Sequence, residues 1–258
     1  MAWYESFFSE DYMRFHLLGG EWVEARTPAQ CDFLVEVLEL QPGARVLDLC
    51  CGQGRISVEL ARRGLAVTGL DLSEYLLGLA RERAEQAGVT VEWVHGDMRE
   101  LPWRDEFEAV VSVFTSFGYL ETDEEDEKVL CAARDSLKPR GRLLLDLHNR
   151  EQSALRFQPR NWAEHEGHLV LDDLAWEEKR GRITLARTII APDGVRRQTG
   201  FTLRIYAPSE MMRMLERAGL EWERTYGGWE ASQYTALSRG MTVVARKPGE
   251  ASCAESGP

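Results

Sequence analysis

The sequence predicts an α/β fold in which a mostly parallel sheet is covered by helices and an antiparallel insertion comes late in the chain. Short apolar runs alternate with amphipathic stretches as far as Leu147. This alternation produces parallel strands joined by right-handed helical crossovers. Residues 168–206 instead contain alternating runs separated by Lys-Arg-Gly-Arg and Pro-Asp-Gly turns, which is typical of antiparallel hairpins.

The first forty residues predict two helices ahead of the sheet. Aromatic side chains recur at helical spacing within residues 1–20, at Trp3, Phe7, Phe8, Tyr12, Phe15 and His16. A second helix is expected from about 28 to 40, because Thr27-Pro28 is a favourable helix start. Its apolar residues share one face, namely Phe33, Leu34, Val37 and Leu38.

The most informative stretch is 46–64, VLDLCCGQGRISVELARRG, followed by 67–73, VTGLDLS. It predicts a buried strand, a glycine turn, an amphipathic helix and a second buried strand that ends in Asp71. Gly52 and Gly54 let the backbone approach a ligand closely. A carboxylate at the strand end can accept hydrogen bonds from both hydroxyls of a ribose. The stretch therefore predicts a site for a nucleoside-bearing cofactor.

Two classes of cofactor compete for this turn. A nicotinamide dinucleotide requires a third glycine for close helix–strand packing, and the sequence has Ser57 in that place. Asp48, just ahead of the turn, would repel a pyrophosphate but attract an ammonium group. S-adenosylmethionine carries a ribose, an adenine and a zwitterionic amino acid, and it has no phosphate. Asp48 and Asp71 therefore favour S-adenosylmethionine.

The turn resembles motif I of the class I S-adenosylmethionine-dependent methyltransferases, whose usual form is an acid, one residue and then GxGxG. Asp48, Gly52 and Gly54 match this form, whereas Cys50 replaces the first glycine. We expect the Cys50 side chain to point away from the methionine part of the cofactor and to make no contact with it. The resemblance implies a Rossmann-like, seven-stranded sheet.

Further motifs follow in the order that the resemblance implies. Asp97-Met98, after a third strand, resembles the pair that holds adenine, with Asp97 for the exocyclic amine and Met98 for the ring face. Residues 107–119 resemble the fourth strand and the loop that lines the methyl-transfer centre. Residues 137–147 resemble the helix end, turn and fifth strand. Four ordered motifs at the expected spacing make the resemblance specific.

The resemblance also indicates which residues face the two substrates. Cofactor contacts come mainly from the first three strands, so residues after the fourth and fifth strands should face the acceptor. Tyr119 and His148 are the catalytic candidates, with His148 as a general base. The remaining cofactor candidates are Leu72 beside the ribose acid, Tyr12 from the N-terminal helix, and Arg26 as a clamp for the carboxylate.

Each of these four polar candidates has a plainer structural alternative. Tyr119 could be a packing aromatic, and His148 could be a solvated loop histidine. Tyr12 could belong to an ordinary helix face, and Arg26 could be a solvated arginine at a helix entry. The sequence leaves these alternatives open.

The composition of the chain restricts the kinds of binding partner and the cellular compartment that we expect. The chain has 258 residues and a formal net charge of −12, which disfavours binding to phosphate backbones. Its five cysteines form no CxxC pair or Cys/His zinc pattern, so we expect no metal site and reduced thiols in a cytoplasm. No apolar run approaches ~20 residues, and the N-terminus lacks the basic start of a signal peptide, so we expect no membrane segment.

The predicted organisation is one cofactor-binding domain with an inserted lid. Residues 1–150 and 207–248 form the domain, whose sheet is closed by an antiparallel pair of final strands. Residues 151–206 form the antiparallel β lid over the acceptor, and residues 249–258 form a small, polar, disordered tail.

The predicted function is methyl transfer from S-adenosylmethionine to a nitrogen or oxygen atom of a small-molecule acceptor. This follows from analogy with methyltransferases that carry a β insertion at this place, such as glycine and amino-sugar N-methyltransferases. One alternative is an RNA (tRNA) base methyltransferase, which would need a positively charged groove. Another is a cofactor-binding protein without turnover. The sequence names neither the acceptor nor the methylated atom, and it leaves a homodimer open.

Overall fold

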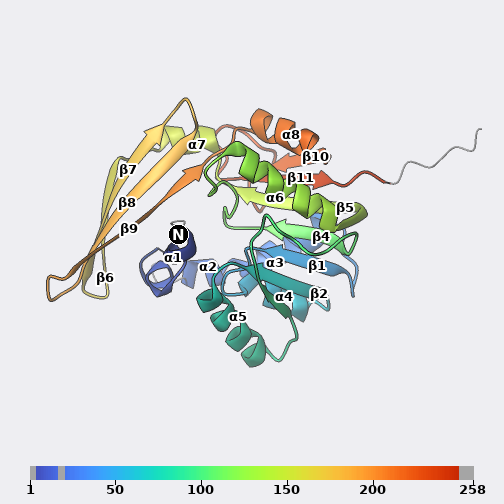
Figure 1. Ribbon diagram of the computed structural model, residues 1–258, viewed down its shortest axis with the longest axis horizontal. Helices are drawn as coiled ribbons and strands as arrows, with labels where there is room; N and C mark the ends of the chain where they lie inside the picture. The colour runs from blue at the N-terminus through green and yellow to red at the C-terminus, as the bar shows by residue number, and fades with distance from the viewer. Residues whose placement is uncertain (1–3, 17–20, 250–258) are drawn as a thin grey trace, which may run out of the picture.

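The computed structural model describes residues 4–16 and 21–249, which form two β-sheets with helices around the larger one (Figure 1). Sheet A has seven strands in the order β10-β11-β5-β4-β1-β2-β3. Its strands are β1 (Arg45–Leu49), β2 (Ala66–Asp71), β3 (Glu92–His95), β4 (Phe107–Ser112), β5 (Leu137–Leu147), β10 (Glu221–Tyr226) and β11 (Met241–Arg246). The first five strands are parallel, and β11 pairs antiparallel with both β5 and β10. The predicted fold class is therefore confirmed.

Helices cover both faces of sheet A. The helices of the described residues are, in chain order, α1 (Tyr4–Phe7), the π-helix η1 (Tyr12–His16), α2 (Glu21–Glu24), α3 (Thr27–Val37), α4 (Arg55–Arg62), α5 (Glu74–Ala87), α6 (Asp123–Ser136), α7 (Arg150–Leu155) and α8 (Pro208–Arg217). One buried cluster joins α6 and α8 to the sheet, and a second joins α3 and α4 to its opposite face. The unbroken apolar strands are buried on both sides, as expected for a parallel sheet covered by helices.

Local sequence signals set the ends of the helices next to the site. Ser73 caps α5, because its hydroxyl accepts a hydrogen bond from the backbone N–H of Leu76 at 3.3 Å. Gly88 ends the same helix in the left-handed conformation that glycine adopts without strain. Thr27-Pro28 begins α3 as the sequence predicts. These signals lie at the helix ends themselves, so a local pattern is enough to find them.

The insertion forms sheet B, with strands β6 (Arg160–His165), β7 (His168–Glu177), β8 (Arg182–Ile190) and β9 (Arg196–Arg204) in consecutive order. The alternating runs predicted within residues 168–206 are the strands β7, β8 and β9, and β6 precedes that range. Strand β6 is exposed along most of its length, so its sequence lacks the apolar alternation that marks a half-buried strand. Sheet B projects away from sheet A, and α1 lies in the angle between them (Figure 1).

The N-terminal aromatic residues do not form the single helix that their spacing predicts. Residues 4–16 form a short α-helix and a separate π-turn instead. The aromatic side chains are divided between two surroundings. Phe15 is fully buried against Val170 and Ile189 of sheet B, whereas Phe8 and Tyr12 line a cavity above sheet A. One face of a straight helix could not direct side chains both to sheet B and to the cavity, which explains why the helix is broken.

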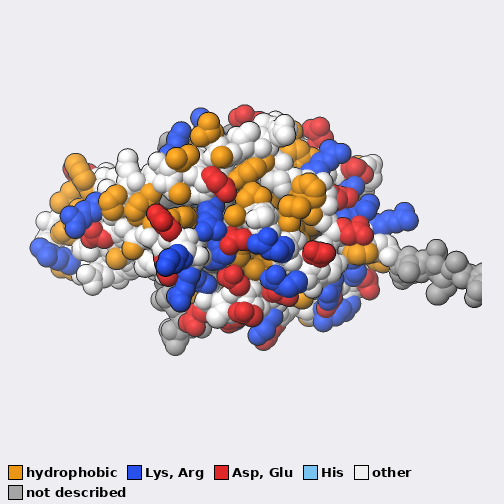
Figure 2. Space-filling model, turned by 90° about the horizontal axis from the view of Figure 1, so that it is seen from above, with side chains coloured by type: hydrophobic (Ala, Val, Ile, Leu, Met, Phe, Trp, Pro, Cys, Tyr) orange, Lys and Arg blue, Asp and Glu red, His pale blue; other side chains and the backbone are white. Residues whose placement is uncertain are grey.

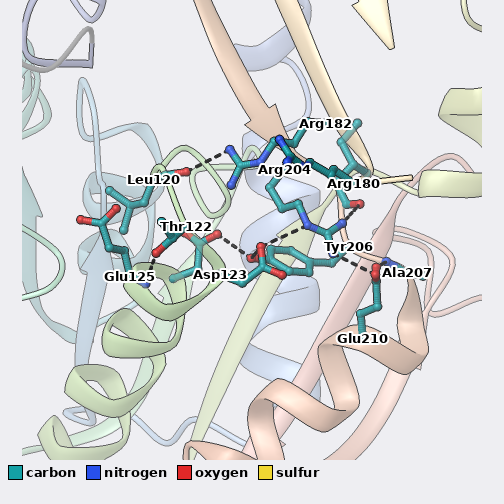
Figure 3. A network of polar contacts seen from close by, with 12 residues as sticks. Leu120, Thr122, Asp123, Glu125, Arg180, Arg182, Arg204, Tyr206, Ala207 and Glu210 are labelled. Carbon is teal, nitrogen blue, oxygen red and sulfur yellow. Dashed lines mark hydrogen bonds and ion pairs between the residues drawn. The ribbon is translucent and has the colours of Figure 1, made fainter. Parts of the chain in front are cut away.

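The base of sheet B is tied to the helical layer by Arg204 at the end of β9 (Figure 3). This guanidinium is 6% exposed, contacts Asp123 at 3.2 Å and Glu210 at 2.8 Å, and lies 4.3 Å from the ring centroid of Tyr206. Its backbone N–H donates a hydrogen bond of 2.8 Å to the carbonyl of Gly118. The insertion is therefore fixed to α6, to α8 and to the loop after β4.

Candidate active site

A cavity of about 1040 Å³, counting its open mouth, lies at the carboxyl ends of β1, β2 and β4. Ligands of open α/β sheets collect at this edge, outside the carboxyl ends of the strands. The lining is mostly apolar and comes from the turn after β1, the end of β2, the loops after β3 and β4, and residues 4–16. Seven residues predicted as site residues line it: Tyr12, Gly52, Asp71, Leu72, Asp97, Met98 and Tyr119. The lining does not include Arg26, Asp48, Gly54 or His148.

Asp71 lies in the wall of this cavity and is held by two hydrogen bonds. Its two carboxylate oxygens accept hydrogen bonds from the backbone N–H groups of Gly52 at 2.7 Å and Ser73 at 2.8 Å. Burial raises the pKa of this carboxyl group, and the two backbone donors oppose the rise. Each oxygen keeps a further lone pair, so the carboxylate can accept two more hydrogen bonds from a ligand.

Asp48 lies below the turn and is 1% exposed. Its Oδ2 accepts a hydrogen bond of 2.5 Å from the hydroxyl of Ser57, and its Oδ1 is buried without a partner. Burial raises the pKa of Asp48 to about 6, although Ser57 and Arg55 act against the rise. Ser57, which stands in the place of a third glycine, thus orients the acid. A buried carboxylate oxygen without a donor can accept a hydrogen bond from a ligand ammonium.

Arg55, which the sequence analysis missed, is the cation that lines the cavity. Its Nη1 donates hydrogen bonds to the hydroxyl of Thr27 at 3.0 Å and to the amide oxygen of Gln30 at 2.5 Å. Its Nη2 is buried without a partner. Arg26, which was predicted as the clamp, is exposed and lies over the ring of Trp22 instead. The signal for Arg55 was its position directly after the glycine turn, at the first residue of α4.

The two glycines of the turn have different roles. A Cβ at Gly52 would meet nothing within 4 Å, so this glycine leaves the backbone open to the cavity. Gly54 precedes α4 with φ 74°, and a Cβ there would lie 2.5 Å from the Trp93 ring. A Cβ at Gly69 on β2 would lie 2.6 Å from the same ring. Gly54 therefore permits a left-handed turn and close packing on Trp93 rather than forming a wall of the cavity.

Cys50 lines the cavity beside Met98, and the expectation that it points away from the methionine part of the cofactor stays a prediction. It adopts φ 62°, the left-handed conformation that the glycine of the usual motif would supply. Its sulfur lies 3.5 Å from that of Met98. Burial, together with the nearby carboxylates, raises the pKa of this thiol well above its ordinary value, so it stays protonated.

Asp97 is already paired within the protein. The guanidinium of Arg99 contacts its carboxylate at 2.6 Å, and the backbone N–H of Arg99 donates to it at 2.8 Å. Burial alone would raise the pKa of Asp97, but the hydrogen bonds from Arg99 outweigh it and lower the pKa. Arg99 also donates to the hydroxyl of Tyr4 at 3.3 Å, which joins α1 to this side of the cavity.

The loop after β4 is strained where it reaches the cavity. Phe114 and Thr115 are consecutive non-glycine residues with φ 63° and 57°. A β-branched residue such as threonine is rare in this conformation. Asp146 holds both residues, since its Oδ2 accepts from the N–H of Phe114 at 3.0 Å and its carbonyl from that of Thr115 at 2.9 Å. Strain of this kind is typical of functional sites.

An aromatic cluster joins this loop to residues 4–16 and to the lid. The ring of Tyr119 packs edge-on against Phe8 at 5.7 Å and Phe201 of β9 at 5.6 Å. Tyr12 stacks on His16 at 5.1 Å. Burial raises the pKa of the Tyr119 phenol far above its ordinary value, so the hydroxyl stays protonated at neutral pH. Three segments far apart in the sequence therefore meet at the carboxyl end of β4.

Two histidines lie near this cluster. Burial and the charge of Arg187 lower the pKa of His16 to about 4, and its Nδ1 is buried without a partner. His148 follows β5. The residue keeps an exposed surface, but the protein around its imidazole partly desolvates the ring and thereby lowers its pKa. Its charge reaches His16 and also lowers the pKa there. Both imidazoles are neutral at pH 7, which is the form that can accept a proton.

The described residues hold no helix long and apolar enough to cross a bilayer. Among the same residues, no group of three or more His, Cys, Asp or Glu side chains is placed to hold a metal ion. The predicted tail of 249–258 lies, apart from Gly249, outside the residues that the structure describes.

Comparison with known proteins agrees with this geometry. Residues 46–141 match a family model described as a methyltransferase domain. YqeM of Bacillus subtilis (strain 168), a methyltransferase by name, is 33% identical over 147 residues, which cover 57% of this chain and 54% of YqeM. The ubiquinone biosynthesis O-methyltransferase of Hahella chejuensis is 32% identical over 154 residues, covering 56% of this chain and 63% of that protein. The chain thus spans little more than half the length of the first of these relatives.

Solved structures show the same fold over nearly the whole chain. An S-adenosylmethionine-dependent methyltransferase from Clostridium acetobutylicum has a TM-score of 0.77 at 16% identity, covering 92% of this chain and 96% of that one. CalS10 is an amino pentose methyltransferase from Micromonospora echinaspora solved with S-adenosylmethionine bound. It has a TM-score of 0.63 at 24% identity, covering 86% of this chain and 91% of that one.

The fold of this chain is that of S-adenosylmethionine-dependent methyltransferases of known structure, and the family match at residues 46–141 agrees with the resemblance seen in the sequence. Within this chain, residues 46–141 are a methyltransferase domain.

Proposed function

We propose that this protein transfers the methyl group of S-adenosylmethionine to a nitrogen or oxygen atom of a small-molecule acceptor. The observation that carries the proposal is Asp71, fixed by the N–H groups of Gly52 and Ser73 inside a mostly apolar cavity at the end of β2. A fixed carboxylate with free lone pairs suits the two hydroxyls of a ribose.

Two unpartnered polar atoms support a zwitterionic amino acid at the other end of the ligand. Asp48 Oδ1 can accept a hydrogen bond from an ammonium group, and Arg55 Nη2 can donate one to a carboxylate. Met98 and Cys50 offer an apolar wall for a flat ring on the side of Asp97. The acceptor at Asp71, the donor at Arg55 and the buried acid Asp48 next to the turn thus support S-adenosylmethionine, and we assign the carboxylate contact to Arg55 rather than Arg26.

S-adenosylmethionine supplies an electrophilic methyl group on its sulfonium when bound. The residues of this chain have to position the acceptor in line with that group and exclude water. The aromatic cluster of Phe8, Tyr119 and Phe201 suits this task, because it joins the cavity to the lid. Neutral His148 is our candidate for the base that takes the proton of the acceptor.

We propose that sheet B, within residues 151–206, is a lid over a small acceptor. Phe201 of sheet B contacts the ring of Tyr119, which lines the cavity, and the base of the sheet is fixed to the loop that bears Tyr119. The O-methylating relative and the amino pentose methyltransferase support an oxygen or a nitrogen acceptor respectively. An RNA acceptor is the second candidate, and the net charge of −12 opposes it. On the face seen in Figure 2, basic side chains are interspersed with acidic ones.

The cofactor assignment is tested by calorimetric titration of the protein with S-adenosylmethionine and with NAD. We expect binding of the first and none of the second. Asp71→Ala removes the ribose acceptor and leaves two backbone donors unsatisfied, so it should weaken binding by about 1–3 kcal/mol. Asp193→Ala, in an exposed turn of the lid, is the control and should bind normally. Unchanged affinity in Asp71→Ala would refute the ribose contact.

The acceptor class is tested with a radiolabelled methyl group. Label is expected in a member of a panel of small amines and hydroxyl compounds and not in total tRNA. Label in tRNA alone would favour the RNA candidate. Tight cofactor binding without transfer to any acceptor would favour a binding protein without turnover.

A further inference from the structure

The inner face of the lid is covered at its tip and partly open at its base. We call inner the face of sheet B on which Phe15 packs against Val170. Successive residues of a strand alternate between its two faces, so Leu174 and Trp176 of β7 share this face with Val170. Val170 is 2% exposed, whereas Leu174 and Trp176 are only partly buried. The cover that Phe15 provides therefore ends before the base of the lid.

The partly open part of this face is apolar and continues to the cofactor cavity. In the register of the sheet, Leu174 lies directly opposite Leu185 of β8, and Leu185 lies directly opposite Phe201 of β9. The ring of Phe201 packs on Tyr119, which lines the cavity. A row of apolar side chains thus leads across the lid from the cavity to Leu174.

A further aromatic side chain borders this row from the helical layer. Phe157 follows α7, is partly buried, and its ring centroid lies 6.3 Å from that of Trp176. Helix α7 lies beside the end of β7 (Figure 1) and begins two residues after His148, the candidate base. Phe157, Leu174 and Trp176, which we call the apolar platform, therefore lie where the lid meets the segment that carries His148.

The charged side chains in the middle of the inner face neutralise each other. Arg187 donates two hydrogen bonds of 2.7 Å to the carboxylate of Asp172 and one of 2.8 Å to the carbonyl of Phe15. These bonds occupy Nε, Nη1 and Nη2 of the guanidinium. The ring of His16, 5.8 Å from that of Phe201, is neutral at pH 7. Because burying an unpaired charge is costly, this face favours an uncharged ligand.

We propose that the apolar platform binds the ring of an uncharged aromatic acceptor whose hydroxyl group is methylated. This inference rests on the proposed function and names the class of acceptor for the same site. A flat ring suits the platform because aromatic side chains bind other rings by offset or edge-on contacts over a large apolar area. A sugar would instead place several hydroxyl groups against apolar side chains that cannot satisfy them.

The acidity of the acceptor also favours an aromatic hydroxyl. The pKa of a phenol is about 10, so its proton is within reach of a neutral imidazole during the reaction. The acceptor oxygen forms a bond to the methyl carbon as the C–S bond breaks. The electron pair of the broken bond stays on the sulfur, and the hydroxyl proton passes to His148.

Two matched ligands test the proposal without requiring turnover. Titration calorimetry of the full-length protein, with S-adenosylhomocysteine present, compares 2-naphthol with 6-hydroxy-2-naphthoate, which adds a carboxylate to the same rings. We expect 2-naphthol to bind about tenfold more tightly or better, because the carboxylate would lose its hydration on the platform. Loss of S-adenosylmethionine binding would refute the proposed function. Normal cofactor binding with equal affinities for the two naphthols would refute this inference alone.

Substitutions of Trp176 locate the binding surface. Trp176→Ala should weaken 2-naphthol binding about tenfold and leave the affinity for S-adenosylmethionine unchanged. Trp176→Phe keeps a ring and should retain most of the affinity for 2-naphthol, so it separates loss of the ring from a defect in folding. Trp222→Ala is the matched control. Trp222 is 44% exposed and is joined through Ala245 to Leu143, away from the carboxyl end of β5, so this variant should bind 2-naphthol normally.

Transfer of a radiolabelled methyl group tests the acceptor atom. We expect label in the oxygen of 2-naphthol, with 2-methoxynaphthalene as the product, and none in D-glucosamine. In Trp176→Ala the KM for 2-naphthol should rise more than kcat falls. Wild-type affinity for 2-naphthol in Trp176→Ala would overturn the proposal. Label in D-glucosamine but not in 2-naphthol, or binding of 2-naphthol without its methylation, would overturn it as well.

Discussion

The hydroxyl of Tyr206 donates a hydrogen bond of 2.6 Å to Oδ2 of Asp126, which links the strand that leaves the lid to helix α6. Asp126 is fully buried, and its Oδ1 has no partner. Burial and the nearby Asp123 raise the pKa of Asp126 to about 7, although the bond from Tyr206 opposes the rise. The same network holds Arg204 at the base of the lid (Figure 3).

The first prediction concerns the pH dependence of folding stability. The folded-state pKa of Asp126 lies above its ordinary value, so the protonated form is favoured in the folded protein. The resulting stability is full below about pH 4 and is lost as pH rises through about 7. Asp126→Asn removes this titrating carboxyl group. The free energy of unfolding of the variant, relative to that of the wild type, should therefore rise by about 2–3 kcal/mol between pH 5 and pH 8.

Urea unfolding of both proteins at several pH values measures this difference directly. Burial also raises the pKa values of Asp48 and Asp146 to about 6, so the free energy of unfolding of both proteins should depend on pH. Only the difference between the two free energies reports the titration of Asp126. Tyr206→Phe is the companion variant. It removes the donor to the ionised carboxylate, so its loss of stability should be larger at pH 8 than at pH 5. A difference between wild type and Asp126→Asn that does not depend on pH would contradict the assignment.

The second prediction concerns the contact between the lid and the loop after β4. Gly118 has φ 103°, and a Cβ there would lie 2.3 Å from the backbone oxygen of Arg204. Gly118→Ala should therefore destabilise the protein by about 2–4 kcal/mol. Gly78→Ala, inside α5 with nothing within 4 Å, is the control and should stabilise by about 0.5–1 kcal/mol. Equal unfolding midpoints for Gly118→Ala and wild type would show that the contact is not tight.

The third prediction separates the two arginines that could hold the cofactor's carboxylate. Arg55→Met removes the buried Nη2 and should weaken S-adenosylmethionine binding by about tenfold or more, the loss expected for a charge-assisted hydrogen bond. Arg26→Ala should leave the affinity nearly unchanged, because that side chain is exposed and lies over Trp22. Unfolding curves without cofactor check that Arg55→Met stays folded. The opposite ranking of the two affinities would restore Arg26 as the clamp.

The glycine turn and its flanking strands could be predicted from sequence, because their signals are local. The apolar run of β1, the turn at Gly52 and the acid at Asp71 lie within about one βαβ unit, whose geometry is nearly fixed. The conformation of Cys50 is also set locally. The turn requires a left-handed residue there, and a cysteine that adopts φ 62° directs its side chain into the cavity.

The rest of the candidate site depends on contacts between distant segments. Arg55 is oriented by Thr27 and Gln30, which precede it by more than twenty residues, and neither pairing has a sequence signal. Phe201 reaches Tyr119 only because β9 is anchored at its base. β6 escaped prediction since a strand exposed on both sides has no apolar period. Sequence patterns thus predicted the residues of the glycine turn better than the contacts between distant segments.

The last prediction concerns His148 and Tyr119 as the groups that face the acceptor. Desolvation lowers the pKa of His148, so the imidazole is neutral at pH 7 and becomes protonated only in more acidic solution. A base of this kind is active above its pKa, and turnover should fall on the acidic side of the pH profile. His148→Gln should lower turnover by about 10²-fold and abolish that acidic limb.

Tyr119→Phe keeps the ring that packs on Phe8 and Phe201 and removes only the hydroxyl, so stability should be nearly unchanged. If this hydroxyl orients the acceptor, KM should rise more than kcat falls. The profile is measured with an acceptor found by the labelling experiment. His16 has a pKa of about 4, so its titration lies below the pH range of the expected limb. An acidic limb that persists in His148→Gln, with turnover equal to wild type, would assign the proton transfer to another group.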